Sequence, residues 1–148
     1  MDAIAPTQIR LAFYESPTEP RIMMFGPMSV DLKSLEDCFK RLSRGEAQVE
    51  FHALPFVFAH GDIKLRMCSV GRVDGGDSRI ASGLCRVENE LDSFEWARTC
   101  EGWGYLAELL SGLTVSPKPA HQYVTRYPDE DAIVVVSKGE YDDSVMAR

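Results

Sequence analysis

The sequence lacks the short motifs that identify the commonest enzyme and cofactor-binding families. It has no G-x-x-x-x-G-K-[ST] phosphate loop, no G-x-G-x-x-G dinucleotide loop, no G-x-S-x-G nucleophile turn and no H-E-x-x-H zinc motif. These absences remove the usual routes to nucleotide, hydrolase and metalloprotease chemistry, although an enzyme without such a motif stays open. We therefore expect no bound cofactor.

Targeting and membrane-spanning segments are also missing. Residues 1–25 lack the basic start, the continuous apolar core and the small-residue cleavage site of a signal peptide. No stretch approaches the ~18 apolar residues that a membrane-spanning helix needs. We expect a cytoplasmic protein that is neither exported by that route nor embedded in a bilayer.

Metal-binding and redox patterns are equally scarce. His52 and His60 share strand parity with Asp62 nearby, but eight residues of extended strand would hold the histidines about 26 Å apart. Asp74 and Asp77 beside two glycines lack the ligand series of a calcium loop. We expect no metal site. Four cysteines form no C-x-x-C pair and are most simply reduced thiols, namely Cys38, Cys68, Cys85 and Cys100.

Acidic residues are in excess, and the excess lies in the second half. The formal net charge is −7; residues 1–70 carry 8 basic and 9 acidic side chains, and residues 71–148 carry 8 and 14. The basic residues are scattered singly or in pairs such as Lys40-Arg41, whereas phosphate recognition needs clusters of Lys and Arg. We expect neither a nucleic acid nor an anionic membrane as partner.

Size and composition are those of one globular domain. The chain has 148 residues, of which 45% are hydrophobic and 26% charged, so it can bury its own core. The sequence shows no internal repeat, and the Gly/Asp/Ser-rich stretch at 73–78 is typical of a loop. We expect a single domain over residues 1–148, with a frayed tail at 142–148.

The first half is predicted to contain two hairpins around a helix. Two short apolar runs between residues 11 and 25 flank a Pro-rich turn, which favours a strand pair. Apolar residues at three- and four-residue spacing predict a helix over 30–43, with Glu36 and Lys40 on its solvent face. The segment 48–69 is predicted to be a second hairpin about Gly61-Asp62, setting Phe58 against Leu65.

The second half is predicted to end in a hairpin with a central strand. Two strands over 80–98, broken near Asn89, precede a helix from Thr99 as its cap to about Ser111. The β-branched run at 132–136 predicts a strand buried on both faces. The order β-β-α-β-β-β-β-α-β-β gives an α+β fold with about eight strands, a mainly antiparallel sheet and two helices packed on one face.

Two groups of residues could carry catalysis. Continued pairing of the last hairpin would place His121 opposite Lys138, with Glu140 close by, and such a set can do acid–base work. Cys100 stands at a helix start, where the dipole lowers the pKa of a thiol. Glu101 next to it counteracts the dipole, and no residue is nominated as a base, so a packed thiol is the simpler interpretation.

An acidic stripe is the preferred binding surface. Glu88, Glu90 and Asp92 would share one face of an extended strand beside Trp96. We therefore expect a non-catalytic interaction protein whose acidic second half meets a basic protein partner. By analogy of size and charge, an inhibitor or immunity-type protein fits. The alternative is a small enzyme or ligand-binding domain with a pocket at His121, Lys138 and Glu140.

Overall fold

The fold is α+β, with its strands divided between two mixed sheets. A computed structural model describes residues 9–26, 29–70, 83–90, 92–115, 118–125 and 130–139; for residues 29–31 it describes the backbone. These residues contain two α-helices, nine strands and a short 3-10 helix. No helix among them combines the length and the apolar character needed to cross a membrane.

Sheet A has five strands and sheet B has four. Sheet A has the order β4 (Val57–Ala59), β1 (Ile9–Tyr14), β2 (Arg21–Gly26), β9 (Ile133–Lys138), β8 (Ala120–Tyr123). Sheet B has the order β3 (Gln48–Glu50), β5 (Lys64–Val70), β7 (Ser93–Thr99), β6 (Gly83–Arg86). The helices are α1 (Ser29–Ser43), α3 (Cys100–Val115) and the 3-10 turn η1 (Phe51–Ala53).

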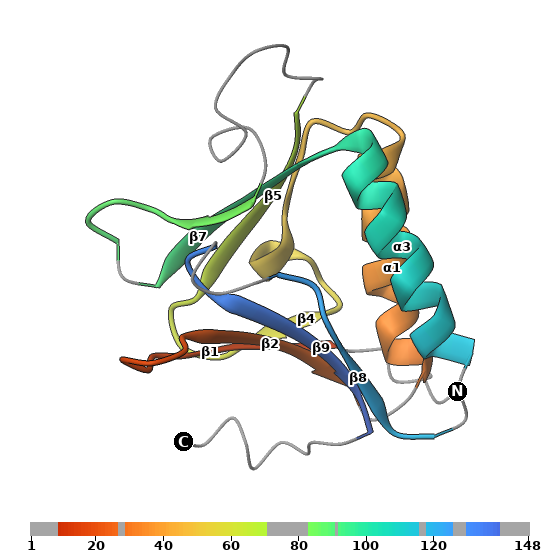
Figure 1. Cartoon of the computed structure of the whole chain (residues 1–148), viewed down its shortest axis with the longest axis horizontal. Coiled ribbons are helices and arrows are strands. Elements are labelled where there is room, and N and C mark those ends of the chain that lie inside the picture. The colour runs from red at the N-terminus through yellow and green to blue at the C-terminus, as the bar shows by residue number, and fades with distance from the viewer. Residues whose placement is uncertain are drawn as a thin grey trace, which may run out of the picture.

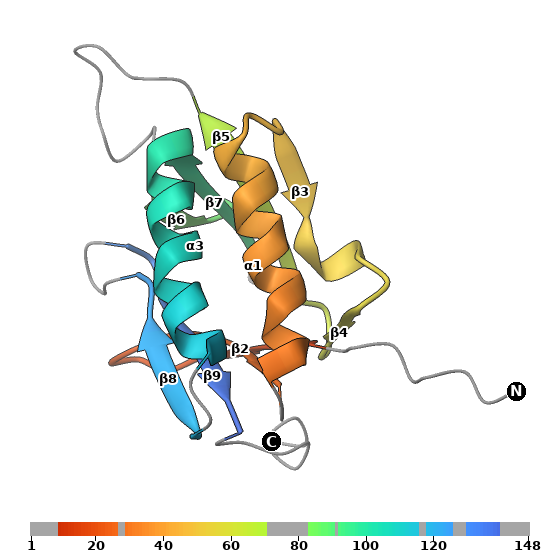
Figure 2. The same ribbon diagram turned by 90° about the vertical axis from the view of Figure 1, so that its right-hand side faces the viewer.

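The two helices lie side by side against both sheets. In Figure 1 they stand along one side of the molecule, sheet A crosses the lower part, and β5 and β7 of sheet B rise above it. Figure 2 shows α1 and α3 running in opposite directions, with sheet B behind their upper halves and β8 and β9 at their lower ends. The main hydrophobic core therefore lies between the helix pair and the two sheets.

The sheet arrangement corrects the expectation of one mainly antiparallel sheet. Among the described strands four pairings are antiparallel and three are parallel. The predicted hairpin about Gly61-Asp62 does not form, because β4 pairs in parallel with β1 in sheet A and β5 joins sheet B. The 3-10 turn that precedes Leu54-Pro55 redirects the chain between the sheets, and a local turn signal could not reveal this.

Both predicted helices are confirmed, with one different end. The hydroxyl oxygen of Thr99 accepts a hydrogen bond from the Gly102 N–H at 3.1 Å, so Thr99 is the N-cap of α3. The helix continues past Ser111, the predicted end, through Gly112, and reaches Val115. Leu113 in this last turn is buried, so packing against the core offsets the cost of a helical glycine.

The topology repeats, although the sequence does not. The first half runs β1-β2-α1-β3-β5, with η1 and β4 inserted before β5, and the second half runs β6-β7-α3-β8-β9. Each sheet combines the first hairpin of one half with the last two strands of the other: β1-β2 joins β9-β8, and β6-β7 joins β5-β3. In both sheets the joining pair, β2 with β9 or β7 with β5, is parallel.

The buried positions of the helices follow the same repeat. Four buried positions of α1 correspond to four of α3 at a constant separation of 71 residues: Leu32 and Trp103, Leu35 and Leu106, Phe39 and Leu110, Leu42 and Leu113. The helix ends are also equivalent. Ser69 at the end of β5 donates its hydroxyl to the carbonyl of Leu42 at 2.5 Å, and Lys138 at the end of β9 donates its ammonium to the carbonyl of Leu113 at 2.9 Å.

Glu36 joins the two helices through a buried carboxylate, and this corrects its predicted place on the solvent face. Its side chain is 3% exposed and accepts hydrogen bonds from the ammonium groups of Lys33 and Lys40, both at 2.8 Å. Thr114 of α3 donates to the other carboxylate oxygen at 3.2 Å. Burial raises the pKa of Glu36, but the hydrogen bonds and charges of the two lysines outweigh it and hold the pKa below its ordinary value.

We predict that Glu36→Gln lowers the free energy of unfolding at pH 7 by about 1–3 kcal/mol, because it removes charged hydrogen bonds from a buried site. A depressed native pKa contributes stability above the unfolded pKa of about 4.3, and this stability is lost as pH falls through the native pKa. The difference between variant and parent should therefore shrink below about pH 4. Urea unfolding at pH 7 and pH 3 measures it.

The matched control is Asp37→Asn, an exposed carboxylate on the same helix whose distance to Lys33 is 3.8 Å. This change should cost less than about 0.5 kcal/mol, as surface pairs do. An equal loss for Glu36→Gln at both pH values would show that the charge of Glu36 is not what stabilises the helix pair.

Candidate functional site

The predicted acidic residues lie at the end of the β6–β7 hairpin. Glu88, Glu90 and Asp92 are all exposed. They occupy the turn between the strands, where Asn89 has φ 66°, so they do not form a stripe along one extended strand. The β6–β7 hairpin, whose turn carries these three residues, protrudes at one side of the molecule (Figure 1).

Trp96 does not belong to this surface. It is 0% exposed and lies in β7, where its ring packs edge-on against Trp103 at 5.0 Å and Phe39 at 5.8 Å between ring centroids. The three rings join sheet B to both helices. The role of Trp96 is therefore in the core, because its strand parity points it inward, away from the exposed Glu95.

The β1–β2 hairpin contacts the base of the β6–β7 hairpin, and the sequence did not reveal this contact. Arg86, next to the β6–β7 turn, forms an ion pair of 2.9 Å with Glu15 of the β1–β2 turn. Its guanidinium also lies over the rings of Phe13 and Phe94, at 5.0 and 5.3 Å from their centroids. We call the exposed carboxylates of these two turns the hairpin-end surface: Glu15, Glu19, Glu88, Glu90 and Asp92.

The side chains of the predicted acid–base cluster lie on different faces. His121 pairs with Ser137 and not with Lys138, which pairs with Ala120, so the register differs by one residue from the prediction. A shift of one residue turns a side chain to the other face of a sheet. His121 is exposed, whereas Lys138 is 4% exposed with its ammonium bound to Leu113. Glu140 lies outside the described residues.

Cys38 is buried, Cys68 and Cys100 are half-buried, and Cys85 is exposed. Cys100 is the first residue of α3, half-buried, and none of the hydrogen bonds within the described part of the chain involves its sulfur. Burial raises the pKa of the Cys38 thiol to about 11, and burial also raises the pKa of Cys68 and Cys85. Thiols of this kind are largely protonated at neutral pH and are poor nucleophiles.

The described residues form no group of three metal-ligating side chains. The Nδ1 atom of His52 accepts the Leu65 N–H at 3.0 Å, so this ring already has a structural partner in β5. Asp74 and Asp77 lie outside the described residues.

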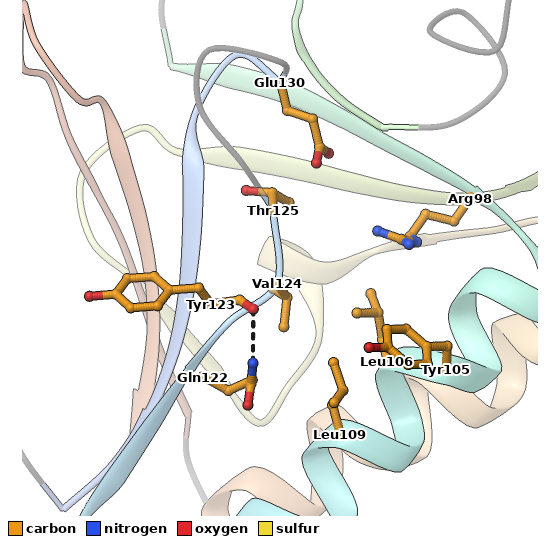
Figure 3. Close-up of a pocket in the computed structure, with 9 residues that line it drawn as sticks. All are labelled: Arg98, Tyr105, Leu106, Leu109, Gln122, Tyr123, Val124, Thr125 and Glu130. Carbon is orange, nitrogen blue, oxygen red and sulfur yellow. Dashed lines mark hydrogen bonds between the residues drawn. The ribbon is translucent and has the colours of Figure 1, made fainter.

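A pocket of about 440 Å³ lies between α3 and β8 (Figure 3). Leu106 and Leu109 of α3 and Val124 after β8 form its apolar part. Tyr105, which is 57% exposed, stands beside this apolar part, whereas the ring of Tyr123 points away from it (Figure 3). The remaining lining residues are polar: Arg98, Gln122, Thr125 and Glu130.

Arg98 is the charged group of this pocket. Its guanidinium points into the pocket from the end of β7 (Figure 3). The Nε atom is buried against the first turn of α3 and has no hydrogen-bond partner within the described part of the chain. A Cβ on Gly102 would lie 3.1 Å from this atom, so a glycine there leaves room for the guanidinium. Burial lowers the pKa of Arg98, although Glu130 opposes this.

Comparison with known proteins does not add a function. No protein-family model matches the chain, and neither the curated proteins nor the solved structures contain a match. A function must therefore be inferred from the chain's own geometry.

We predict that Lys138→Met lowers the free energy of unfolding by about 1.5–3 kcal/mol, because methionine keeps the apolar stem but leaves the buried carbonyl of Leu113 without its charged donor. Chemical denaturation measures the loss. Lys64→Met, at an exposed position of β5, is the control and should stay within about 0.5 kcal/mol of the parent. Equal stability of Lys138→Met and the parent would place Lys138 outside the structural framework and return it to the functional candidates.

Proposed function

We propose that the protein is a non-catalytic binding protein whose hairpin-end surface engages a basic protein partner. The observation that carries the proposal is the juxtaposition of two turns about seventy residues apart in sequence, joined by the Arg86–Glu15 ion pair. Together they present five exposed carboxylates, two of which are neutralised within the surface by Arg21 and Arg86. The net charge of −7 adds to this local field.

Exposed charges of this kind favour association more than they favour stability. The attraction between a surface carboxylate and a basic partner acts over roughly the 8–10 Å screening length at physiological ionic strength. Such steering raises the association rate and selects the sign of the partner's charge. An inhibitor or immunity-type role would use this property, and here it is supported by size and charge alone.

The positions of the catalytic candidates support a binding role over catalysis. His121 and Lys138 face different sides of sheet A, and the ammonium of Lys138 already holds the end of α3. Cys100 is a half-buried free cysteine at the start of α3. The alternative function, a ligand-binding domain, is favoured by one specific observation, the pocket at Arg98, which needs none of these residues.

We predict that neutralising the turn will slow association with the partner. The test compares the parent with a Glu88→Gln, Glu90→Gln, Asp92→Asn variant. A partner captured from the native host would be purified. Its rate of association with the parent and with the variant would then be measured from about 50 to 500 mM salt, an interval that spans the screening range. The variant should associate more slowly at low salt and show a smaller salt dependence, while dissociation changes less.

A matched control separates the surface from the net charge. Asp37→Asn, Glu101→Gln and Glu108→Gln remove the same three charges from exposed positions on the helices. This variant should associate at nearly the rate of the parent. Equal rates and salt slopes for the turn variant and the parent, or an equal loss in both variants, would rule out the hairpin-end surface as the binding site.

A further inference from the structure

The pocket between α3 and β8 occurs where the second half departs from the topological repeat. Val49 pairs with Met67 in the first half, and Gln122 pairs with Val136 at the equivalent place in the second. One residue beyond each strand stands Phe51 or Val124. Phe51 is fully buried in the main core, whereas the smaller Val124 lines the pocket beside α3.

Arg98 is a second residue at which this part of the second half differs from the first half. Buried positions of β2 and β7 correspond at a separation of 72 residues, Ile22 with Phe94 and Met24 with Trp96. The next pair in this register is Gly26 and Arg98. The first half therefore folds with no side chain where the second half has a guanidinium, so the architecture itself does not require Arg98.

The guanidinium of Arg98 is incompletely paired within the described residues. Its buried Nε atom has no hydrogen-bond partner there, and Glu130 acts on its charge through space. Nearby polar groups have other partners: the Thr125 hydroxyl donates to Ala132 and accepts from Val134, both at 2.7 Å, and Glu130 accepts the Leu84 N–H at 2.8 Å. A half-buried cation in this state is stabilised by an anion that enters the pocket.

We propose that this pocket binds a small organic monocarboxylate with an apolar body. The carboxylate would take the planar fork of Arg98, which matches its two oxygens. The apolar body would lie against Leu106, Leu109 and Val124, with the Tyr105 ring beside it. A volume of about 440 Å³ is within the range of small-molecule sites.

A single negative charge fits better than a phosphate dianion. The carboxylate of Glu130 lines the same pocket and points toward the space in front of Arg98 (Figure 3), so it repels a dianion more strongly than a monoanion. The net charge of −7 acts in the same direction. The apolar wall also offers nothing to the remaining oxygens of a phosphate.

The experiment titrates the full chain with acetate, butanoate and 3-phenylpropanoate, followed by NMR chemical shifts. The neutral 3-phenylpropanamide and inorganic phosphate are the comparison probes. We expect saturable binding that strengthens from acetate to 3-phenylpropanoate, with the shifted resonances clustered on α3 and β8. The amide and phosphate should each bind at least about tenfold more weakly than 3-phenylpropanoate, since they lack the matched charged contact.

Three variants assign the contacts. Arg98→Gln should weaken 3-phenylpropanoate at least about tenfold and leave the amide unchanged, because only the charged contact is lost. Val124→Phe introduces the side chain that Phe51 provides in the first half. This change should fill the pocket and abolish binding of both 3-phenylpropanoate and its amide, while the protein still unfolds cooperatively. Arg66→Gln, an exposed arginine of β5, is the control and should bind as the parent does.

Several results would overturn the proposal. These are the absence of saturable binding by any of the three acids, equal affinity for the acid and its amide, tighter binding of phosphate, or unchanged acid binding by Arg98→Gln. None of them bears on the hairpin-end surface, because Arg98 and the pocket lie outside it, so the two proposals can fail separately.

Discussion

Neither half of the chain can complete a sheet with its own strands, and the rest of the structure follows from this constraint. The first hairpin of each half pairs with the last two strands of the other half, through the parallel contacts of β2 with β9 and β7 with β5. Parallel neighbours of this kind are joined through long connections. The core is therefore formed by the two halves together, with α1 and α3 packed side by side over both sheets.

The repeated topology separates what the fold requires from what it does not. Helix positions that face the core are apolar in both halves, and each helix ends on a side chain supplied by the last strand of its own half, Ser69 or Lys138. These contacts recur because the architecture needs them. Arg98 and Gln122 correspond to residues of different chemistry, Gly26 and Val49, and Val124 corresponds to the larger Phe51. The three meet around one pocket.

The pairing of each half's first hairpin with strands of the other half also affects the charged surface. The β1–β2 and β6–β7 hairpins belong to different halves and different sheets, and Arg86 joins them by its ion pair with Glu15 and its position over Phe13 and Phe94. Glu15 of one hairpin thereby meets the base of the other hairpin, about seventy residues away in the chain. The acidic character of the protein is a property of its composition, but this contact is a property of the tertiary structure.

The sequence alone was sufficient to predict the features that depend on a few neighbouring residues. Both helices, the Thr99 cap, the β1–β2 hairpin, the break at Asn89 and the buried strand at Ile133–Val136 follow from apolar spacing, capping and β-branching. Which strands pair with each other could not be predicted from the sequence, because a strand such as Lys64–Val70 can pair equally well with a neighbour in sequence or with β7. A one-residue difference in register then separated His121 from Lys138, and the inward parity of β7 moved Trp96 into the core. The pocket at Arg98 arises from three elements of the second half whose spacing no local pattern encodes, so only the packed structure could reveal it.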